Sequence, residues 1–445
     1  MPVRRFEFKD SRSYKFWEIE IEGTAFTVRY GKVGTDGVTQ TKSYASADKA
    51  AAEAQKKITE KVRKGYAEVG SVAPVRKQAT EADSTADWSV RADELQAAGD
   101  PWGQRIALWI AREAASTNKK RALTKEIVAL DSEHRDHFYG PALAELLEDA
   151  KFAEVARLTW EYGYITRARV GMPEYGFKGP KAKEVLRAIV QSPAAKHLRE
   201  LTIGLYDYEG GGLVGVGSDI ASGGTLAHLE KLFIGDFHFE QQEISWVSHG
   251  DLSPLYAVTP KLATLRLHGA GMILGELEHP TLARLEIETG GLPRESVVSL
   301  ANAKLPELVH LEVWFGRRDY GGTNDITALR PIFTTKTLPK LRHLGLQNAE
   351  IQDEIAAELA NSPLLAQVES VDLSMGTMRE PGARALLANA ASYKHLKSLN
   401  LERNYIPADL ASQLTSAFGS MVKLGRQGTP DVYDGENHYY TSVGE

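Results

Sequence analysis

The segment LKSLNLERN at residues 396–404 contains the pattern that organises most of this 445-residue chain. Leu396, Leu399 and Leu401 form a core L-x-x-L-x-L, in which the last leucines alternate with polar residues as in a half-buried strand. The same core, with leucine, isoleucine or valine at the three positions, occurs eight times. The eight cores are Leu198/Leu201/Ile203, Leu229/Leu232/Ile234, Leu262/Leu265/Leu267, Leu282/Leu285/Ile287, Leu308/Leu311/Val313, Leu341/Leu344/Leu346, Val368/Val371/Leu373 and Leu396/Leu399/Leu401. Their spacing averages about 28 residues, which predicts repeated units of a strand and a connection that stack side by side.

The alternation also predicts which side chains are available to a partner. Motif leucines are expected to point into the core, and the residues between them to line the concave face of the stacked repeats. Arginine and aromatic residues in such positions favour a protein interface. The predicted protein-binding residues are Lys231, Phe233, Arg266, His268, Arg284, Glu286, His310, Glu312, Trp314, His343, Asp372 and Asn400.

Residues 1–69 have a different pattern, which predicts a small α+β domain. FWEIEI at 16–21 alternates apolar and polar residues as a strand does, and TDG at 35–37 offers turn chemistry. Ser46 suits the N-cap of a following amphipathic helix, and Gly65 suits its C-cap.

The remaining segments complete the domain plan. Residues 70–87 are small and polar without a period, which predicts a linker. Residues 88–195 show helical apolar spacing, so we expect a helical segment that caps the repeats. The repeats are predicted over 196–410, with a C-terminal cap and tail over 411–445.

Composition is typical of a soluble globular protein, with 42% hydrophobic and 25% charged residues. The chain has no cysteine, which excludes disulfides and thiolate metal sites, and it has no apolar run of membrane-spanning length. We therefore expect a cytoplasmic protein that needs no cofactor. The net charge is −6, yet residues 1–69 carry 14 basic against 10 acidic residues, a balance that suits an anionic partner.

Residues 4–66 resemble a WGR domain. The resemblance rests on FWEI at 16–19, YGKVGT at 30–35, KSY at 42–44 and KVRKGY at 61–66. The Trp-Gly-Arg that names the family reads Tyr30, Gly31 and Lys32 here. WGR domains occur in DNA-damage-responsive poly(ADP-ribose) polymerases, where this loop helps grip a DNA end, and in bacterial proteins resembling the molybdate-metabolism regulator. The resemblance implies stacking by Tyr30 and phosphate pairing by Lys32. The implied nucleic-acid-binding residues are Arg29, Tyr30, Gly31, Lys32 and Lys42.

Residues 198–404 resemble bacterial leucine-rich repeats of the ribonuclease-inhibitor type. This resemblance implies a horseshoe with a parallel sheet, so the whole chain is predicted to be an α/β protein. Asn404 stands where that repeat family places an asparagine to satisfy turning backbone, and Asn348 stands one position short of the same place.

Three functions remain open from the sequence. The favoured one is a non-enzymatic adaptor whose repeats bind a protein partner. The first alternative is a DNA- or RNA-binding protein acting through the WGR domain, and the second is a hydrolase within 88–195, for which no motif is present. His134 and His137 lie three residues apart near Asp131, but we expect a solvated helix end there and predict no metal site.

Overall fold

The chain folds into two compact units, Met1–Asp87 and Trp88–Glu445. The computed structural model describes residues 3–9, 14–32, 38–44, 46–64, 66–72, 85–208 and 211–444. Three features discussed above lie outside the described residues: the predicted turn at 35–37, the predicted C-cap Gly65, and most of the predicted linker, 73–84.

The first unit is a five-stranded sheet packed against one helix. Its elements are β1 (Val3–Lys9), β2 (Tyr14–Glu22), β3 (Ala25–Lys32), β4 (Val38–Ser43), α1 (Ala47–Arg63) and β5 (Ala67–Val72). The strand order is β4-β3-β2-β1-β5 and all the pairs are antiparallel. Phe6, Trp17 and Ile19 of the sheet bury their side chains against Ala54 and Ile58 of α1. The predicted α+β arrangement is therefore observed, with β1 before the predicted elements and β5 after them.

The second unit is built on an eleven-stranded sheet in the order β18-β17-β16-β15-β14-β13-β11-β9-β8-β7-β6. The strands are β6 (Ala156–Glu161), β7 (Tyr164–Val170), β8 (Glu200–Ile203), β9 (Lys231–Ile234), β11 (Thr264–His268), β13 (Arg284–Glu288), β14 (His310–Gly316), β15 (His343–Ala349), β16 (Ser370–Asp372), β17 (Ser398–Asn400) and β18 (Val422–Lys423). Each of the eight motifs supplies one strand, and neighbouring motif strands pair in parallel. The expected single parallel sheet is thus present.

Burial follows the predicted alternation. In β11 and β13 the motif residues are buried and the residues between them are half-buried or exposed. The buried side chains join one core that extends through the second unit. Asn404 is fully buried, and its Nδ2 donates hydrogen bonds to the carbonyls of Leu373 and Leu401, at 2.8 and 3.1 Å. It thereby satisfies backbone groups where the chain turns, as the motif position predicts.

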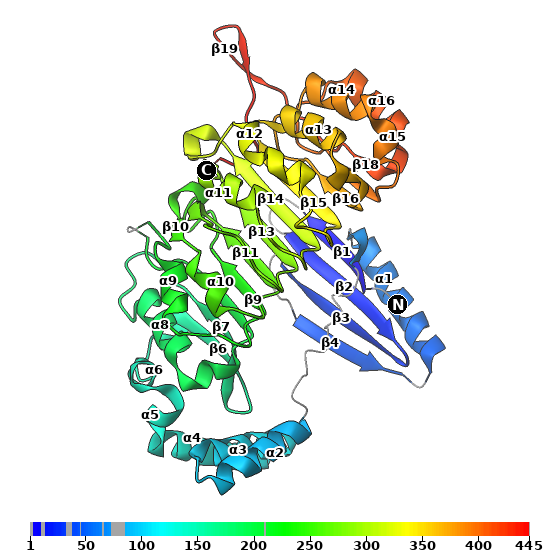
Figure 1. The fold of residues 1–445 in the computed structure, drawn as a ribbon. Helices are drawn as coiled ribbons and strands as arrows, with labels where there is room; N and C mark the ends of the chain where they lie inside the picture. Colours follow the sequence, from blue (N-terminus) through cyan, green and yellow to red (C-terminus); the bar gives the residue numbers. More distant parts are fainter. Residues whose placement is uncertain are drawn as a thin grey trace. The chain divides into compact units, whose positions relative to one another are not determined.

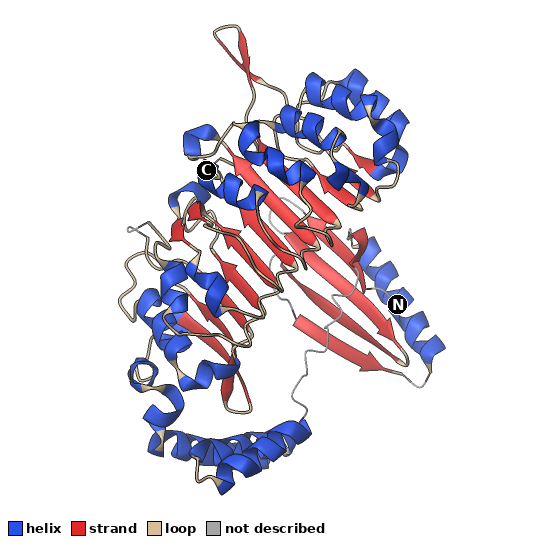
Figure 2. Ribbon diagram, viewed as in Figure 1, coloured by secondary structure: helices blue, strands red, loops and turns tan. Residues whose placement is uncertain are grey.

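The helices of the second unit are α2 (Thr85–Ala97), α3 (Pro101–Ala114), α4 (Thr117–Glu133), α5 (Arg135–Tyr139), α6 (Pro141–Leu146), α7 (Phe152–Val155), α8 (Ala182–Gln191), α9 (Val216–Ala221), α10 (Pro254–Val258), α11 (Arg294–Ala301), α12 (Ile326–Leu329), α13 (Gln352–Ala360), α14 (Glu380–Ala388), α15 (Ala390–Tyr393) and α16 (Ala408–Phe418). In Figure 1, α2, α3 and α4 lie beyond the β6–β7 end of the sheet. Figure 1 shows α9 to α14, which connect the motif strands, along one side of the sheet, and Figure 2 separates the helical layer from the strands by colour. None of the helices in the described part of the chain combines the length and hydrophobicity that a membrane crossing requires.

The prediction of an all-helical segment over 88–195 is wrong for residues 156–170. These residues form the antiparallel hairpin β6–β7, and β7 continues the sheet by pairing in parallel with β8. Tyr162 and Gly163 turn the chain with φ angles of 50° and 85°, the positive values that tight hairpin turns require. The buried Arg105 holds the hairpin to the helices, since its Nη1 donates to the Gly163 carbonyl and its Nε donates to Asp131 at 2.7 Å.

Two further strand pairs stand outside the large sheet. β10 (Ser248–Asp251) pairs in parallel with β12 (Ala270–Ile273), and β19 (Asp431–Tyr433) pairs with β20 (Glu436–His438) in an antiparallel hairpin. After this hairpin the C-terminal segment returns to the sheet. Val443 exchanges two hydrogen bonds with the Asn348 side chain, and the Ser442 amide donates to the carbonyl of Met375 at 2.8 Å. Asn348, which stood one position away from the repeat pattern, therefore anchors this segment.

Leu344→Ala tests the importance of the inward face for stability. Leu344 is fully buried at the centre of the sheet, so the substitution should remove contacts and leave a cavity. We expect a loss of about 2–5 kcal/mol in the free energy of unfolding, measured by urea denaturation. A loss below about 0.5 kcal/mol would contradict the assignment of this face to the core.

The acid sensitivity of the second unit should depend on His249. This side chain in β10 is fully buried, and burial lowers the pKa of its imidazole to about 4. In the unfolded chain it titrates near 6.5, so its contribution to stability is complete above that pH and is lost as the pH falls toward 4. When the pH falls from 7 to 5, the free energy of unfolding should therefore fall by about 1–2 kcal/mol more in the unmodified chain than in His249→Leu. Equal losses would contradict a neutral buried His249.

Candidate binding surfaces

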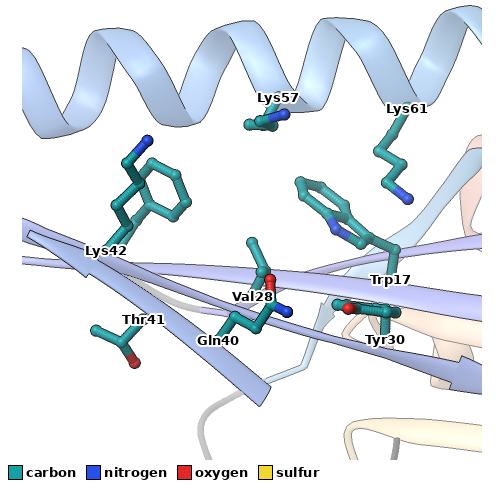
Figure 3. A pocket seen from close by; sticks show the side chains of 9 residues that line it. Trp17, Val28, Tyr30, Gln40, Thr41, Lys42, Lys57 and Lys61 are labelled. Carbon is teal, nitrogen blue, oxygen red and sulfur yellow. The ribbon is translucent and has the colours of Figure 1, made fainter. Parts of the chain in front are cut away.

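A groove of about 620 Å³ lies between α1 and the sheet of the first unit. Figure 3 shows its lining, with strand residues below and helix residues above. Trp17, Phe26, Val28 and Tyr30 form an aromatic and apolar floor. The groove is completed by Gln40, Thr41, Lys42, Lys57 and Lys61. It therefore combines flat rings with three ammonium groups.

The lysines lie close to aromatic rings. The Lys61 Nζ is 4.9 Å from the ring centroid of Tyr66, 5.6 Å from that of Trp17 and 6.0 Å from that of Tyr30. The Lys42 Nζ is 5.5 Å from the ring centroid of Tyr44. Cations at these distances are attracted by the ring faces, which holds positive charge at the groove.

The residues that the WGR resemblance predicted to bind nucleic acid lie in different places in the structure. Tyr30 and Lys42 both line the groove. Arg29 lies on the opposite face of the sheet, where its Nε donates to Glu18 at 2.8 Å and its guanidinium stands over Phe16. Gly31 and Lys32 belong to β3, but the Lys32 side chain lies outside the described residues.

The WGR resemblance did not single out Phe26, Lys57 and Lys61, which also line the groove. The available signal was helix periodicity, because Lys57 and Lys61 are one turn apart and follow the apolar face that carries Ala54 and Ile58. A lysine at such a position extends its ammonium group across the edge of the helix.

The second candidate surface is the side of the large sheet opposite the helices, which we call the open face. Parallel pairing places residues of successive motifs in register and so builds rows across the strands. The first row is Glu200, Lys231, Thr264, Arg284, His310, His343, Ser370 and Ser398. The second row is Thr202, Phe233, Arg266, Glu286, Glu312, Gly345, Asp372 and Asn400. A third row includes the pairs His268–Glu288 and Trp314–Gln347. All twelve residues predicted from the alternation therefore lie on this face.

Side chains of the open face contact one another extensively. Arg266 forms a bidentate pair with Glu288, at 3.0 and 3.1 Å, and its guanidinium lies 4.5 Å from the ring centroid of Phe233. Phe233 is thus partly covered by its neighbour, while Lys231 and Arg284 are exposed. Trp314 is half-buried, and its indole Nε1 is buried without a hydrogen-bond partner among the described residues.

Burial shifts the titration of several groups on this face. It lowers the pKa of His268 and of His343 to about 4 each, so both imidazoles are neutral at pH 7. It raises the pKa of Glu288 and of Asp372, because desolvation disfavours the carboxylate form. The middle of the open face is therefore polar but poorly hydrated.

The hydrolase alternative stays a prediction: a groove of about 650 Å³ borders the helical segment, and Asp100, His137 and Tyr164 are among its lining residues. His137 Nε2 lies 3.0 Å from Asp100 Oδ1, and Asp131 is held by Arg105 and by the Tyr139 hydroxyl at 2.6 Å. His134 is not part of either pairing. Asp131, His134 and His137 do not converge on a common point, and Asp131 belongs to a partly buried network with Arg105.

Three comparisons relate the chain to known proteins. It is 45% identical over 65 residues to the uncharacterized protein YfeS of Escherichia coli strain K12, which covers 15% of this chain and 27% of YfeS. It is 44% identical over 66 residues to YehF of the same organism, which covers 15% and 24%. The chain thus spans about a quarter of the length of these curated relatives. A crystal structure of a Bacteroides fragilis protein aligns over 99% of both chains with 28% identity and a TM-score of 0.50. Residues 3–72 match the family of the WGR domain, and this module forms the N-terminal unit of the chain.

Proposed function

We propose that the protein is a cytoplasmic, non-enzymatic binding protein whose open face recognises a protein partner. In this proposal the second unit is a leucine-rich-repeat horseshoe, and the WGR domain supplies a second contact. The observation that carries the proposal is the difference in side chains between the two faces of the sheet. Apolar motif residues are buried on the helical side, whereas arginine, histidine, carboxylate and aromatic side chains form rows on the other.

The composition of the open face supports a protein partner. Arginine and tryptophan are enriched among the side chains that dominate binding energy in protein interfaces. Arg266 pairs with Glu288 and Arg284 pairs with Glu286, so neither is an isolated charge, and Trp314 lies on the same face in β14. Such a surface is ordered before a partner arrives, which lowers the entropic cost of binding.

Charge reversal on the two faces tests this proposal. Arg284→Glu changes an exposed residue of the open face, and Glu354→Arg changes an exposed residue of α13 on the helical side. We expect Arg284→Glu to weaken capture of the partner from the native host by about tenfold or more, and Glu354→Arg to have little effect. Melting temperatures close to that of the unmodified chain confirm that both variants fold. Weaker capture by Glu354→Arg alone would move the proposed surface to the helices.

A second candidate function is nucleic-acid binding through the WGR groove. It is favoured by the aromatic floor and three lysines of the groove, a combination that suits stacked bases and backbone phosphates. The surplus of basic residues in the first 69 positions points in the same direction. Arg29 has no part in this proposal because it is paired with Glu18 on the opposite face.

Two adjacent lysines provide a matched test of nucleic-acid binding. Lys57 lines the groove, whereas Lys56 is not among the lining residues and its ammonium pairs with Glu53 at 2.6 Å. Anisotropy with single-stranded DNA and RNA and with blunt-ended DNA should give affinities that fall steeply with salt. Lys57→Ala should reduce the salt slope by about one phosphate contact, and Tyr30→Ala should cost about 1–3 kcal/mol. Lys56→Ala should leave both quantities nearly unchanged. Absence of binding at low salt would contradict this function.

A further inference from the structure

We propose that His310, Glu312 and His343 form a binding site for a divalent transition-metal ion on the open face, best suited to Zn²⁺. One candidate ligand atom from each residue lies within 4.8 Å of the other two. Two imidazole nitrogens and one carboxylate oxygen are a ligand set that Zn²⁺ uses, with a fourth position left for water or another ligand. This site goes beyond the proposed protein-binding function and does not depend on it.

Strand register brings the three residues together. His310 in β14 is paired with His343 in β15, and Glu312 follows His310 by two residues on the same face. The His310 Nε2 and the Glu312 Oε2 are 3.3 Å apart. Two ligand atoms about 2.0 Å from a tetrahedral zinc ion are separated by about 3.3 Å, so this pair already has the required spacing.

The second imidazole is oriented by its neighbour. His343 Nδ1 lies 2.8 Å from the Ser370 hydroxyl, whereas its Nε2 is buried without a hydrogen-bond partner among the described residues. When Nδ1 carries the proton, Nε2 has a free lone pair. Histidine ligands are commonly fixed in this way, with one ring nitrogen held by an outer partner and the other on the metal. A buried unsatisfied nitrogen is costly, and a metal ion would satisfy it.

Space beside the carboxylate depends on a glycine. Gly345 stands opposite Glu312 in the neighbouring strand. A Cβ atom at this position would lie 3.1 Å from the Glu312 Cγ and 2.9 Å from the Gln347 Nε2. The missing side chain therefore leaves Glu312 room to turn toward the histidines.

The charges around the site favour a dication. The open face of β11 to β16 carries four carboxylates, Glu286, Glu288, Glu312 and Asp372, and two guanidinium groups, Arg266 and Arg284. These six groups sum to two negative charges, which a divalent ion would offset.

Metal binding requires a small rearrangement of the rings. The His310 and His343 rings are stacked, with centroids 4.1 Å apart and planes 13° apart. Because the nitrogen lone pairs lie in the ring planes, the planes must open before both nitrogens face one ion. X-ray absorption at the zinc edge should then show two imidazole ligands on the bound ion.

The test is a titration of the full-length, chelator-treated protein with ZnCl₂ in the absence of any partner. We expect one ion per chain at this site, and absorption spectra with two imidazole ligands. Glu312→Gln keeps side-chain size while removing the anionic ligand, and His343→Ala removes one imidazole; each should weaken binding at least tenfold or abolish it. Ser370→Ala, which releases the outer partner, should weaken it by about tenfold.

His238→Ala is the matched control, because His238 is exposed and distant in sequence from the cluster. Zinc should also raise the melting temperature of the unmodified chain but not that of Glu312→Gln. Binding that is unchanged in Glu312→Gln and His343→Ala, or lost only in His238→Ala, would overturn the proposal, as would no binding to the unmodified chain. Since no partner is present, failure here leaves the proposed protein-binding function untouched, and loss of partner capture leaves the metal site untouched.

Discussion

Burial of the motif leucines on one side of a parallel sheet is the constraint on which the rest of the second unit depends. Leu265, Leu285, Leu311 and Leu344 stand side by side in four consecutive strands, each at most 1% exposed. Because strand side chains alternate, fixing these leucines inward fixes the residues on either side of them outward. A one-residue slip of any strand would exchange the two sets, so hydrophobic burial sets the register and the open face together.

Strand register then brings residues that are far apart along the chain close together in space. Residues about one repeat apart become neighbours in a row, as His310 and His343 do across β14 and β15. The chemistry of the open face is therefore assembled from single residues of several repeats. Each motif strand contributes packing on one side and one or two polar or aromatic side chains on the other. In the proposed function, substitutions on the open face would alter recognition while the apolar contacts that hold the strands remain.

Much of this architecture was predictable from the sequence, and the exceptions have physical causes. The period of Leu198 to Leu401 predicted the strands, and the alternation predicted the membership of the open face. The His310–Glu312–His343 cluster was not predicted, because its existence depends on which strands are neighbours and on the exact pairing of residues. The β6–β7 hairpin was missed because its short alternating segments lie among helices of much stronger periodicity. The anchoring of residues 442 and 443 involves contacts about 70 to 95 residues away, which no local pattern reports.

In the WGR domain, too, the sequence predicted the module but only part of its candidate site. The family resemblance was correct for the module, yet it grouped Arg29 with Tyr30, which the alternation of β3 places on opposite faces. Alternation within one strand could have separated them. The groove lysines on α1, by contrast, reach the strand residues only through the packing of helix on sheet. The candidate site of this unit therefore had to be assembled from tertiary contacts.

The most direct test of the central claim is site-specific photo-crosslinking in the native host. A benzophenone side chain is introduced at Phe233 on the open face or at Val298 on α11, and the crosslinked partners are compared. The division of the sheet into a packing face and a recognition face predicts a discrete crosslinked protein from position 233 and none from position 298. The same protein crosslinked from position 298 and not from position 233 would contradict it.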